Sequence, residues 1–154
     1  MKLPKMFTFL AVYSTLFFED FTTSSWNDRW VQSHWMNEKS GSWNVNNSKL
    51  VTTEDARFYS IATNITKFVA FDDHNALTLQ YSVKFPKTLS CAGAYIKLFP
   101  PLKTLKIRGG ENETQYSLMF GPDVCGSQKL HAIIPYNGSN RELIKQLQCN
   151  RDDI

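Results

Sequence analysis

Short segments in which apolar and polar residues alternate recur along this chain, and polar turns separate them. The clearest is ALTLQYSVKF at residues 76–85, where every second residue from Leu77 to Phe85 is apolar and the residues between them are mostly polar. Alternation with a period of two places the apolar side chains on one side of an extended backbone. The segment predicts a strand with one solvated face, which is typical of an antiparallel sheet.

Other segments predict further strands on the same grounds, and turn-forming pairs such as Asp72-Asp73, Gly109-Gly110 and Asn137-Gly138 separate several of them. Helical periodicity is weak, and residues 141–148 fit a short helix or a strand equally well. The pattern therefore predicts an all-β domain, either a sandwich or a barrel. The additional strands are predicted at residues 16–21, 30–35, 57–63, 94–99, 116–120 and 130–135.

The first residues have the layout of a secretory signal. Lys2 and Lys5 precede a short apolar run at residues 6–12, and small residues follow it. This pattern predicts a signal peptide at residues 1–14 and a globular part at residues 15–154; the alternative is a buried first strand with no leader. The sequence offers no stretch of about 18 apolar residues, so no membrane span is predicted.

Cysteine content and glycosylation triplets agree with a secretory route. The chain has three cysteines, Cys91, Cys125 and Cys149, which in an oxidising compartment favours one disulfide and one free thiol. Four Asn-x-Ser/Thr triplets are possible glycan acceptors. They begin at Asn46, Asn64, Asn112 and Asn137.

Charge argues against nucleic acid as a partner. The formal net charge is +3, and two of the basic residues, Lys2 and Lys5, lie in the predicted leader. The remainder is close to neutral and has no basic stripe, so the electrostatic attraction that phosphate backbones require is missing.

Candidate chemistry is concentrated between Cys91 and Cys125. Tyr95 and Lys97 are two residues apart and therefore share a face of the predicted strand, and Tyr116 lies on the next predicted strand. Tyrosine offers an aromatic surface and a hydroxyl, lysine donates hydrogen bonds, and Asp123 accepts them, a combination that suits a sugar. The alternative is an ordinary sheet with two tyrosines, a solvated lysine and a turn aspartate.

Catalysis has little support in the sequence. A glycosidase needs two carboxylates that flank the scissile bond, whereas Glu19 and Asp20 are adjacent and would point to opposite faces of a strand. The three histidines lack metal-motif spacing, no Gly-x-Ser-x-Gly motif occurs, and His131 within an apolar segment is predicted to be a core histidine. We therefore expect a binding protein rather than an enzyme.

Two segments resemble signatures of the calreticulin–calnexin family. LMFGPDVCG at residues 118–126 is similar to the second signature at every position. CAGAYIKLFP at residues 91–100 is similar to the first, except that Ala92 stands where the family has glycine. Trp26, Trp30 and Cys149 match as well, and the similarity extends from about residue 16 to the end of the chain.

The resemblance implies a legume-lectin-like jelly-roll β-sandwich. It also implies the role of a calcium-dependent lectin chaperone in the endoplasmic reticulum lumen, binding monoglucosylated glycans on newly made, unfolded glycoproteins. By position, Cys91 and Cys125 would form the family's disulfide, and Cys149 would be a free thiol. The implied calcium ligands are Asp20, Asn46 and Ser48, and the implied sugar-contacting residues are Tyr95, Lys97, Tyr116, Met119, Asp123 and Ile133.

Several family features are not found in this sequence. It has no proline-rich arm, no acidic tail and no retrieval signal of the Lys-Asp-Glu-Leu type. The later strands of the sandwich are also missing, so we expect an incomplete domain that folds poorly alone, because a divided sandwich exposes strand edges and core surface. The alternatives are a secreted carbohydrate-binding or interaction protein, or an inactive fragment of the family.

Overall fold

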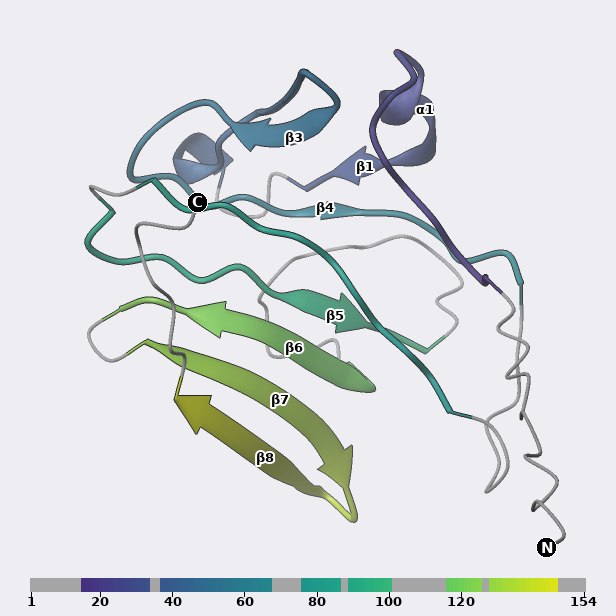
Figure 1. Cartoon of the computed structure of the whole chain (residues 1–154), viewed down its shortest axis with the longest axis vertical. Helices are drawn as coiled ribbons and strands as arrows, with labels where there is room; N and C mark the ends of the chain where they lie inside the picture. The colour runs from purple at the N-terminus through teal and green to yellow at the C-terminus, as the bar shows by residue number, and fades with distance from the viewer. Residues whose placement is uncertain are drawn as a thin grey trace, which may run out of the picture. The chain divides into compact units, whose positions relative to one another are not determined.

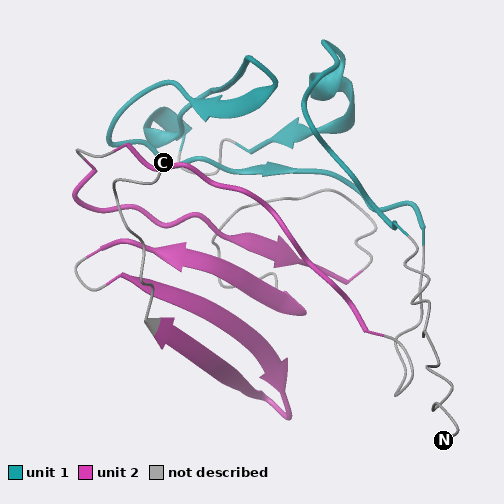
Figure 2. Cartoon of the chain, viewed as in Figure 1, with its two compact units in different colours: residues 1–74 teal, residues 75–154 magenta. Residues whose placement is uncertain are grey.

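The chain forms two compact units, Met1–His74 and Asn75–Ile154, which are coloured separately in Figure 2. The computed structural model describes residues 15–33, 37–67, 76–86, 89–100, 116–125 and 128–146. The predicted signal peptide lies outside these ranges, and so does Cys149. Each unit is described by itself.

The first unit contains short elements joined by turns. Strands β2 and β3 form an antiparallel hairpin in which Asn46 pairs with Lys49. Asn47 and Ser48 between them have φ of 49° and 55°, the left-handed conformation that matches a two-residue turn to the twist of the strands. Strands β1 and β4 pair antiparallel as a second, separate ladder. The elements are α1 (Trp26–Arg29), β1 (Val31–Gln32), η1 (Asn37–Lys39), β2 (Trp43–Asn46), β3 (Lys49–Thr52) and β4 (Ile61–Ala62).

A buried carboxylate organises the start of this unit. The Glu19 side chain is only 7% exposed and forms an ion pair of 2.9 Å with Arg29. It also accepts hydrogen bonds from the Trp30 indole at 3.0 Å and from the Phe21 backbone N–H at 2.9 Å. Burial opposes ionisation of Glu19, but the hydrogen bonds from Trp30, Arg29 and Phe21 outweigh it and lower its pKa.

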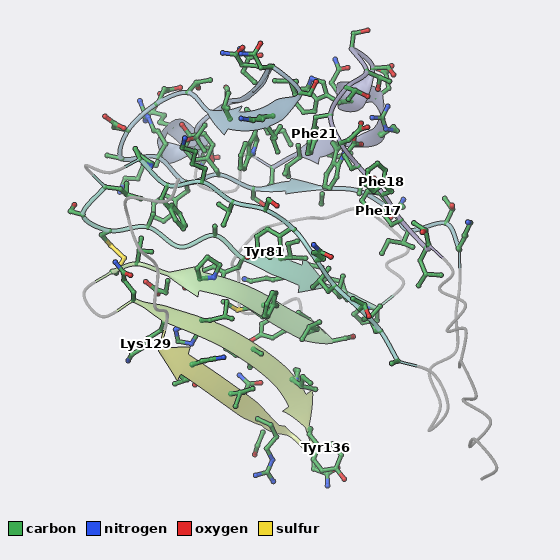
Figure 3. All side chains as sticks on the ribbon, viewed as in Figure 1. Phe17, Phe18, Phe21, Tyr81, Lys129 and Tyr136 are labelled. Atoms are coloured by element: carbon green, nitrogen blue, oxygen red, sulfur yellow. A yellow bond between two sulfur atoms is a disulfide. The ribbon has the colours of Figure 1, made fainter. Side chains whose placement is uncertain are left out.

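This arrangement corrects the strand predicted at residues 16–21. The backbone there is irregular, and Phe21 has a φ of 55°. The Phe21 ring packs on Trp30 and Trp26, with centroid distances of 5.9 and 6.4 Å. Phe17, Phe18 and Phe21 are labelled in Figure 3. Local hydrogen bonds to Glu19 and aromatic packing fix this segment in place of sheet pairing.

The second unit is built on a four-stranded antiparallel sheet in the sequential order β5-β6-β7-β8. Figure 1 shows these strands side by side, with β8 at the edge. Asn137 and Gly138, with φ of 48° and 73°, form the tight turn between β7 and β8, so residues 141–148 provide a strand rather than a helix up to residue 146. The strands are β5 (Ile96–Leu98), β6 (Leu118–Asp123), β7 (Lys129–Tyr136) and β8 (Ser139–Gln146).

The register gives this sheet two chemically different faces. Directly opposite residues lie on the same face, and successive residues of a strand alternate between faces. One row across all four strands consists of Lys97, Met119, Ile133 and Glu142. We call the face that carries this row the mixed face.

The opposite face, which we call the apolar face, carries the row Ile96, Phe120, Ala132 and Leu143. Leu143 remains 71% exposed, and in the described part of the chain no hydrophobic side chain is fully buried. Incomplete burial of this kind is expected when the apolar face of a sheet is only partly covered, as in part of a sandwich.

The strand predicted at residues 76–85 is wrong as a strand. The described residues of this segment are not assigned to a strand, although Leu79, Tyr81 and Phe85 are half-buried and the polar residues between them are exposed. The Tyr81 hydroxyl donates to the Ala94 carbonyl at 2.8 Å, and its ring packs edge-on against Phe120 at 6.1 Å. The alternation identified the more buried side only in part, because Leu77 and Val83 on that side are exposed, and the segment is held by side-chain contacts instead of a ladder.

The fold class predicted from the sequence is confirmed. Strands are the main regular secondary structure of the described residues, and all pairings between named strands are antiparallel. The helices among these residues, α1 and η1, have four and three residues. Within the described ranges, no helix has the length and hydrophobicity needed to cross a membrane.

Candidate functional site

A disulfide between Cys91 and Cys125 closes one end of the β5–β6 pair, with the two Cα atoms 4.1 Å apart. Gly93 and Asp123 form an antiparallel bridge beside it, which continues the β5–β6 register toward the disulfide. Backbone hydrogen bonds of 3.0 and 2.8 Å flank this bridge. The predicted disulfide is confirmed, and it holds the two signature segments together.

Tyr95 and Asp123 meet directly on the mixed face. The Tyr95 hydroxyl donates to Asp123 Oδ2 at 2.8 Å, and the Cys125 backbone N–H donates to Asp123 Oδ1 at 2.8 Å. The hydrogen bond from Cys125, followed by that from Tyr95, holds the pKa of Asp123 below its usual value. Burial, reinforced by the Asp123 carboxylate, raises the pKa of Tyr95, so the phenol stays protonated.

Gly93 makes room for the Tyr95 ring. A Cβ at position 93 would lie 2.4 Å from Tyr95 Cε2, so any side chain there would displace the ring. The Tyr95 ring thus requires the glycine at position 93, the residue directly after Ala92.

Lys97 and Tyr116 form the second contact of the site. The Lys97 ammonium lies 5.6 Å from the centroid of the Tyr116 ring, within the range of a cation–π interaction. A backbone hydrogen bond of 2.7 Å from Ser117 to Leu98 holds the residues before β6 against β5. Each tyrosine is therefore paired with a charged partner.

Met119 and Ile133 supply the apolar part of the mixed face. They are directly opposite each other on β6 and β7, and Met119 is directly opposite Lys97 on β5. Both side chains are half-buried. All six residues predicted to contact sugar therefore belong to one unit and surround a single disulfide-linked pair of strands.

This set of groups can hold a polyhydroxylated ring. Aromatic and aliphatic side chains pack against the C–H face of a hexose, whereas the ammonium and the carboxylate bind its hydroxyls. The carboxylate is already ionised and oriented by two donors, so little reorganisation is needed on binding.

Sequence reasoning missed a polar pair on the same face, His131 and Glu142. His131 Nδ1 lies 2.6 Å from Glu142 Oε1, with side chains 19% and 38% exposed. His131 was predicted to be a satisfied core histidine, and its side chain is indeed only 19% exposed and has a polar partner, although that partner is a carboxylate on the mixed face. The position of His131 two residues before Ile133 was the available signal, since both must share a face of β7.

The predicted calcium ligands do not form a site by themselves. Asp20 is exposed, and its Oδ1 accepts hydrogen bonds from the Thr22 backbone N–H and hydroxyl at 3.0 and 2.8 Å. Asn46 and Ser48 lie at the exposed β2–β3 turn. Across the described residues there is no cluster of three or more His, Cys, Asp or Glu side chains that could hold a metal ion. Calcium binding by these three residues stays a prediction.

The antiparallel sheets place the chain in the class of all-β proteins, and a four-stranded sheet with one incompletely covered apolar face is consistent with part of a β-sandwich. A sequence profile of the calreticulin family matches residues 17–153. The chain belongs to the calreticulin family.

Curated relatives agree with this assignment. The chain is similar to calreticulin from Dictyostelium discoideum, with 37% identity over 155 residues that cover 92% of this chain and 35% of the relative. It is 33% identical to calreticulin from Onchocerca volvulus, covering 95% of this chain and 40% of the relative. It is 40% identical to calreticulin from Schistosoma mansoni, covering 82% and 34%. The chain thus spans between about a third and two fifths of the length of these relatives.

Proposed function

We propose that this chain is a carbohydrate-binding region of a lectin chaperone, and that its mixed face binds the terminal glucose of glucose-capped oligomannose glycans. The observation that carries the proposal is the Tyr95–Asp123 hydrogen bond beside the Lys97–Tyr116 contact. It supplies a ring, an oriented acceptor and a donor on one pair of strands. Membership of the calreticulin family supports the choice of ligand.

Each group has a separate part in the proposed complex. Tyr95 and Tyr116 pack against the sugar ring, Asp123 accepts hydrogen bonds from its hydroxyls, and Lys97 donates to its oxygens. Met119 and Ile133 cover the apolar side of the next sugar. The Tyr95 hydroxyl donates its hydrogen bond to Asp123, so its oxygen remains available to accept one from a sugar hydroxyl.

Membership of the calreticulin family supports a wider role. We propose that the chain acts in the lumen of the endoplasmic reticulum on newly made, unfolded glycoproteins and assists their folding without catalysing a reaction. Calcium would act there as a structural ion, with Asp20 as the anionic ligand and Asn46 and Ser48 as neutral oxygen donors.

Glycan-array binding of the oxidised chain tests the proposal. Glucose-capped oligomannose is expected to bind, and the same glycan without its glucose is expected to bind weakly. Tyr95→Ala and Tyr116→Ala should each remove most of the binding, because each removes a ring and a hydroxyl. Unchanged binding in both variants, or no preference for the glucose cap, would contradict the proposal. Binding measured with calcium and with a chelator tests the ion separately.

A further inference from the structure

Tyr95 and His131 come together because the residue between them has no side chain. The register of β5 and β6 places Tyr95 opposite Gly121, and Gly121 is directly opposite His131 on β7. Strands β5 and β7 have β6 between them, so their backbones are separated by about 10 Å. The Tyr95 and His131 rings nevertheless approach to 6.5 Å between centroids in an edge-on arrangement, with an interplanar angle of 67°.

Glu142 fixes the other side of the His131 ring. Glu142 is directly opposite Ile133, so it is a diagonal neighbour of His131 on the mixed face. Its carboxylate is an acceptor, and the His131 Nδ1–H therefore donates to Glu142 Oε1 across 2.6 Å. This hydrogen bond fixes the rotation of an imidazole that otherwise has two equivalent orientations.

The contacts form one continuous series from the edge strand to the disulfide. Glu142 holds His131, the His131 ring packs against Tyr95, and the Tyr95 hydroxyl donates to Asp123. Tyr95 is thus restrained at its ring by His131 and at its hydroxyl by Asp123. The absence of a side chain at Gly93 leaves room for the Tyr95 ring in the position that these two contacts fix.

We propose that Glu142 and His131 are positioning residues for Tyr95, and that they preorganise its ring for the sugar. The part that concerns sugar rests on the proposed function. Neither residue has to touch the ligand, since fixing the ring before binding removes the entropic cost of ordering it in the complex.

The first experiment needs no ligand. The full chain is labelled with [13Cε]tyrosine, and the Tyr95 signals are assigned by comparison with the Tyr95→Phe variant. Glu142→Ala should shift and broaden these signals, whereas Glu142→Gln should leave them near their original positions because its amide still bonds the imidazole. Lys145→Ala, an exposed change on the same strand but the other face, is the matched control. Unchanged Tyr95 signals in Glu142→Ala would overturn the positioning role.

The second experiment measures affinity for glucose-capped oligomannose by calorimetry. Glu142→Ala should bind about fivefold more weakly, the effect of a lost hydrogen bond transmitted through one ring contact, and Glu142→Gln should restore affinity to within about twofold. Equal affinity of Glu142→Ala and the unchanged chain, or a failure of Glu142→Gln to restore binding, would overturn the inference. If the unchanged chain binds no glycan, the proposed function fails, and the tyrosine spectra still decide the positioning role.

Discussion

The Tyr95 hydroxyl donates a hydrogen bond of 2.8 Å to a carboxylate oxygen of Asp123. Asp123 lies two residues before Cys125, which forms the disulfide with Cys91. Tyr95→Phe removes this hydrogen bond and keeps the ring. We expect glycan affinity to fall by up to about tenfold, since Asp123 loses a donor that orients it and ordering a side chain on binding costs about 0.5–1.5 kcal/mol. Calorimetric titration measures it, and Tyr136→Phe, a change at the exposed β7–β8 turn (Figure 3), should have no effect.

Gly93→Ala should impair binding more than stability. The added Cβ would lie 2.4 Å from the edge of the Tyr95 ring, and a side chain can move aside where a backbone cannot. We expect the Tyr95 ring to turn away from Asp123, with affinity for glucose-capped oligomannose reduced at least as much as in Tyr95→Phe. The free energy of unfolding, obtained from urea denaturation, should fall by only about 0.5–1.5 kcal/mol, the usual net contribution of one hydrogen bond. A variant that binds normally would show that the ring does not need this space.

Gly121→Ala is predicted to do the reverse. A Cβ at this position would lie 2.1 Å from the Ala94 carbonyl oxygen and 2.9 Å from Tyr95 Cα, both backbone atoms of the neighbouring segment. Relief requires β5 and β6 to separate, so the unfolding free energy should fall by about 1–3 kcal/mol, the usual cost of overpacking. Urea denaturation followed by tryptophan and tyrosine fluorescence measures the loss. A midpoint equal to that of the unchanged chain would contradict the close approach.

Glu19→Gln should remove an acid-sensitive contribution to stability. The folded-state pKa of Glu19 lies below the reference value of 4.5, so its ionised form stabilises the fold at pH above that value. This contribution disappears as pH falls through the lowered folded-state pKa. The variant should therefore be less stable than the unchanged chain at pH 7, and the difference should shrink below pH 4.5. Urea midpoints at several pH values measure it; a difference that stays constant with pH would show that the charge of Glu19 is not responsible.

The second unit was the more predictable one. Strands β6 and β7 were expected at nearly their observed positions, because short apolar segments lie there. Strand β6 nevertheless continues through Gly121, Pro122 and Asp123, three residues beyond its predicted end at residue 120. The contacts of Tyr95 with Asp123 and of Lys97 with Tyr116 also join residues that were singled out from the sequence. Glu142 was missed because residues 141–148 fit a helix as well as a strand, and its partner His131 becomes visible only when β8 is placed in register.

Local sequence could not settle the remaining elements. The β2–β3 hairpin was not among the predicted strands, since its turn of Asn47 and Ser48 lacks the glycine that usually identifies a two-residue turn. Residues 76–85 have the clearest alternation in the chain, yet they are not assigned to a strand. Alternation reports which side of a segment is solvated, whereas a strand also needs a neighbour with free backbone groups, and that depends on distant parts of the chain.

The opposite chemistry of the two sheet faces couples correct pairing to ligand recognition. A slip of one residue between β6 and β7 would turn every β7 side chain to the opposite face of the sheet relative to β6. Ile133 would then no longer lie opposite Met119, and Ala132 would no longer lie opposite Phe120. A chain with this wrong register would still contain strands, but it would lack the mixed face that we propose binds the glycan. Glycan retention on an affinity column would therefore separate correctly paired molecules from misregistered ones that circular dichroism cannot distinguish.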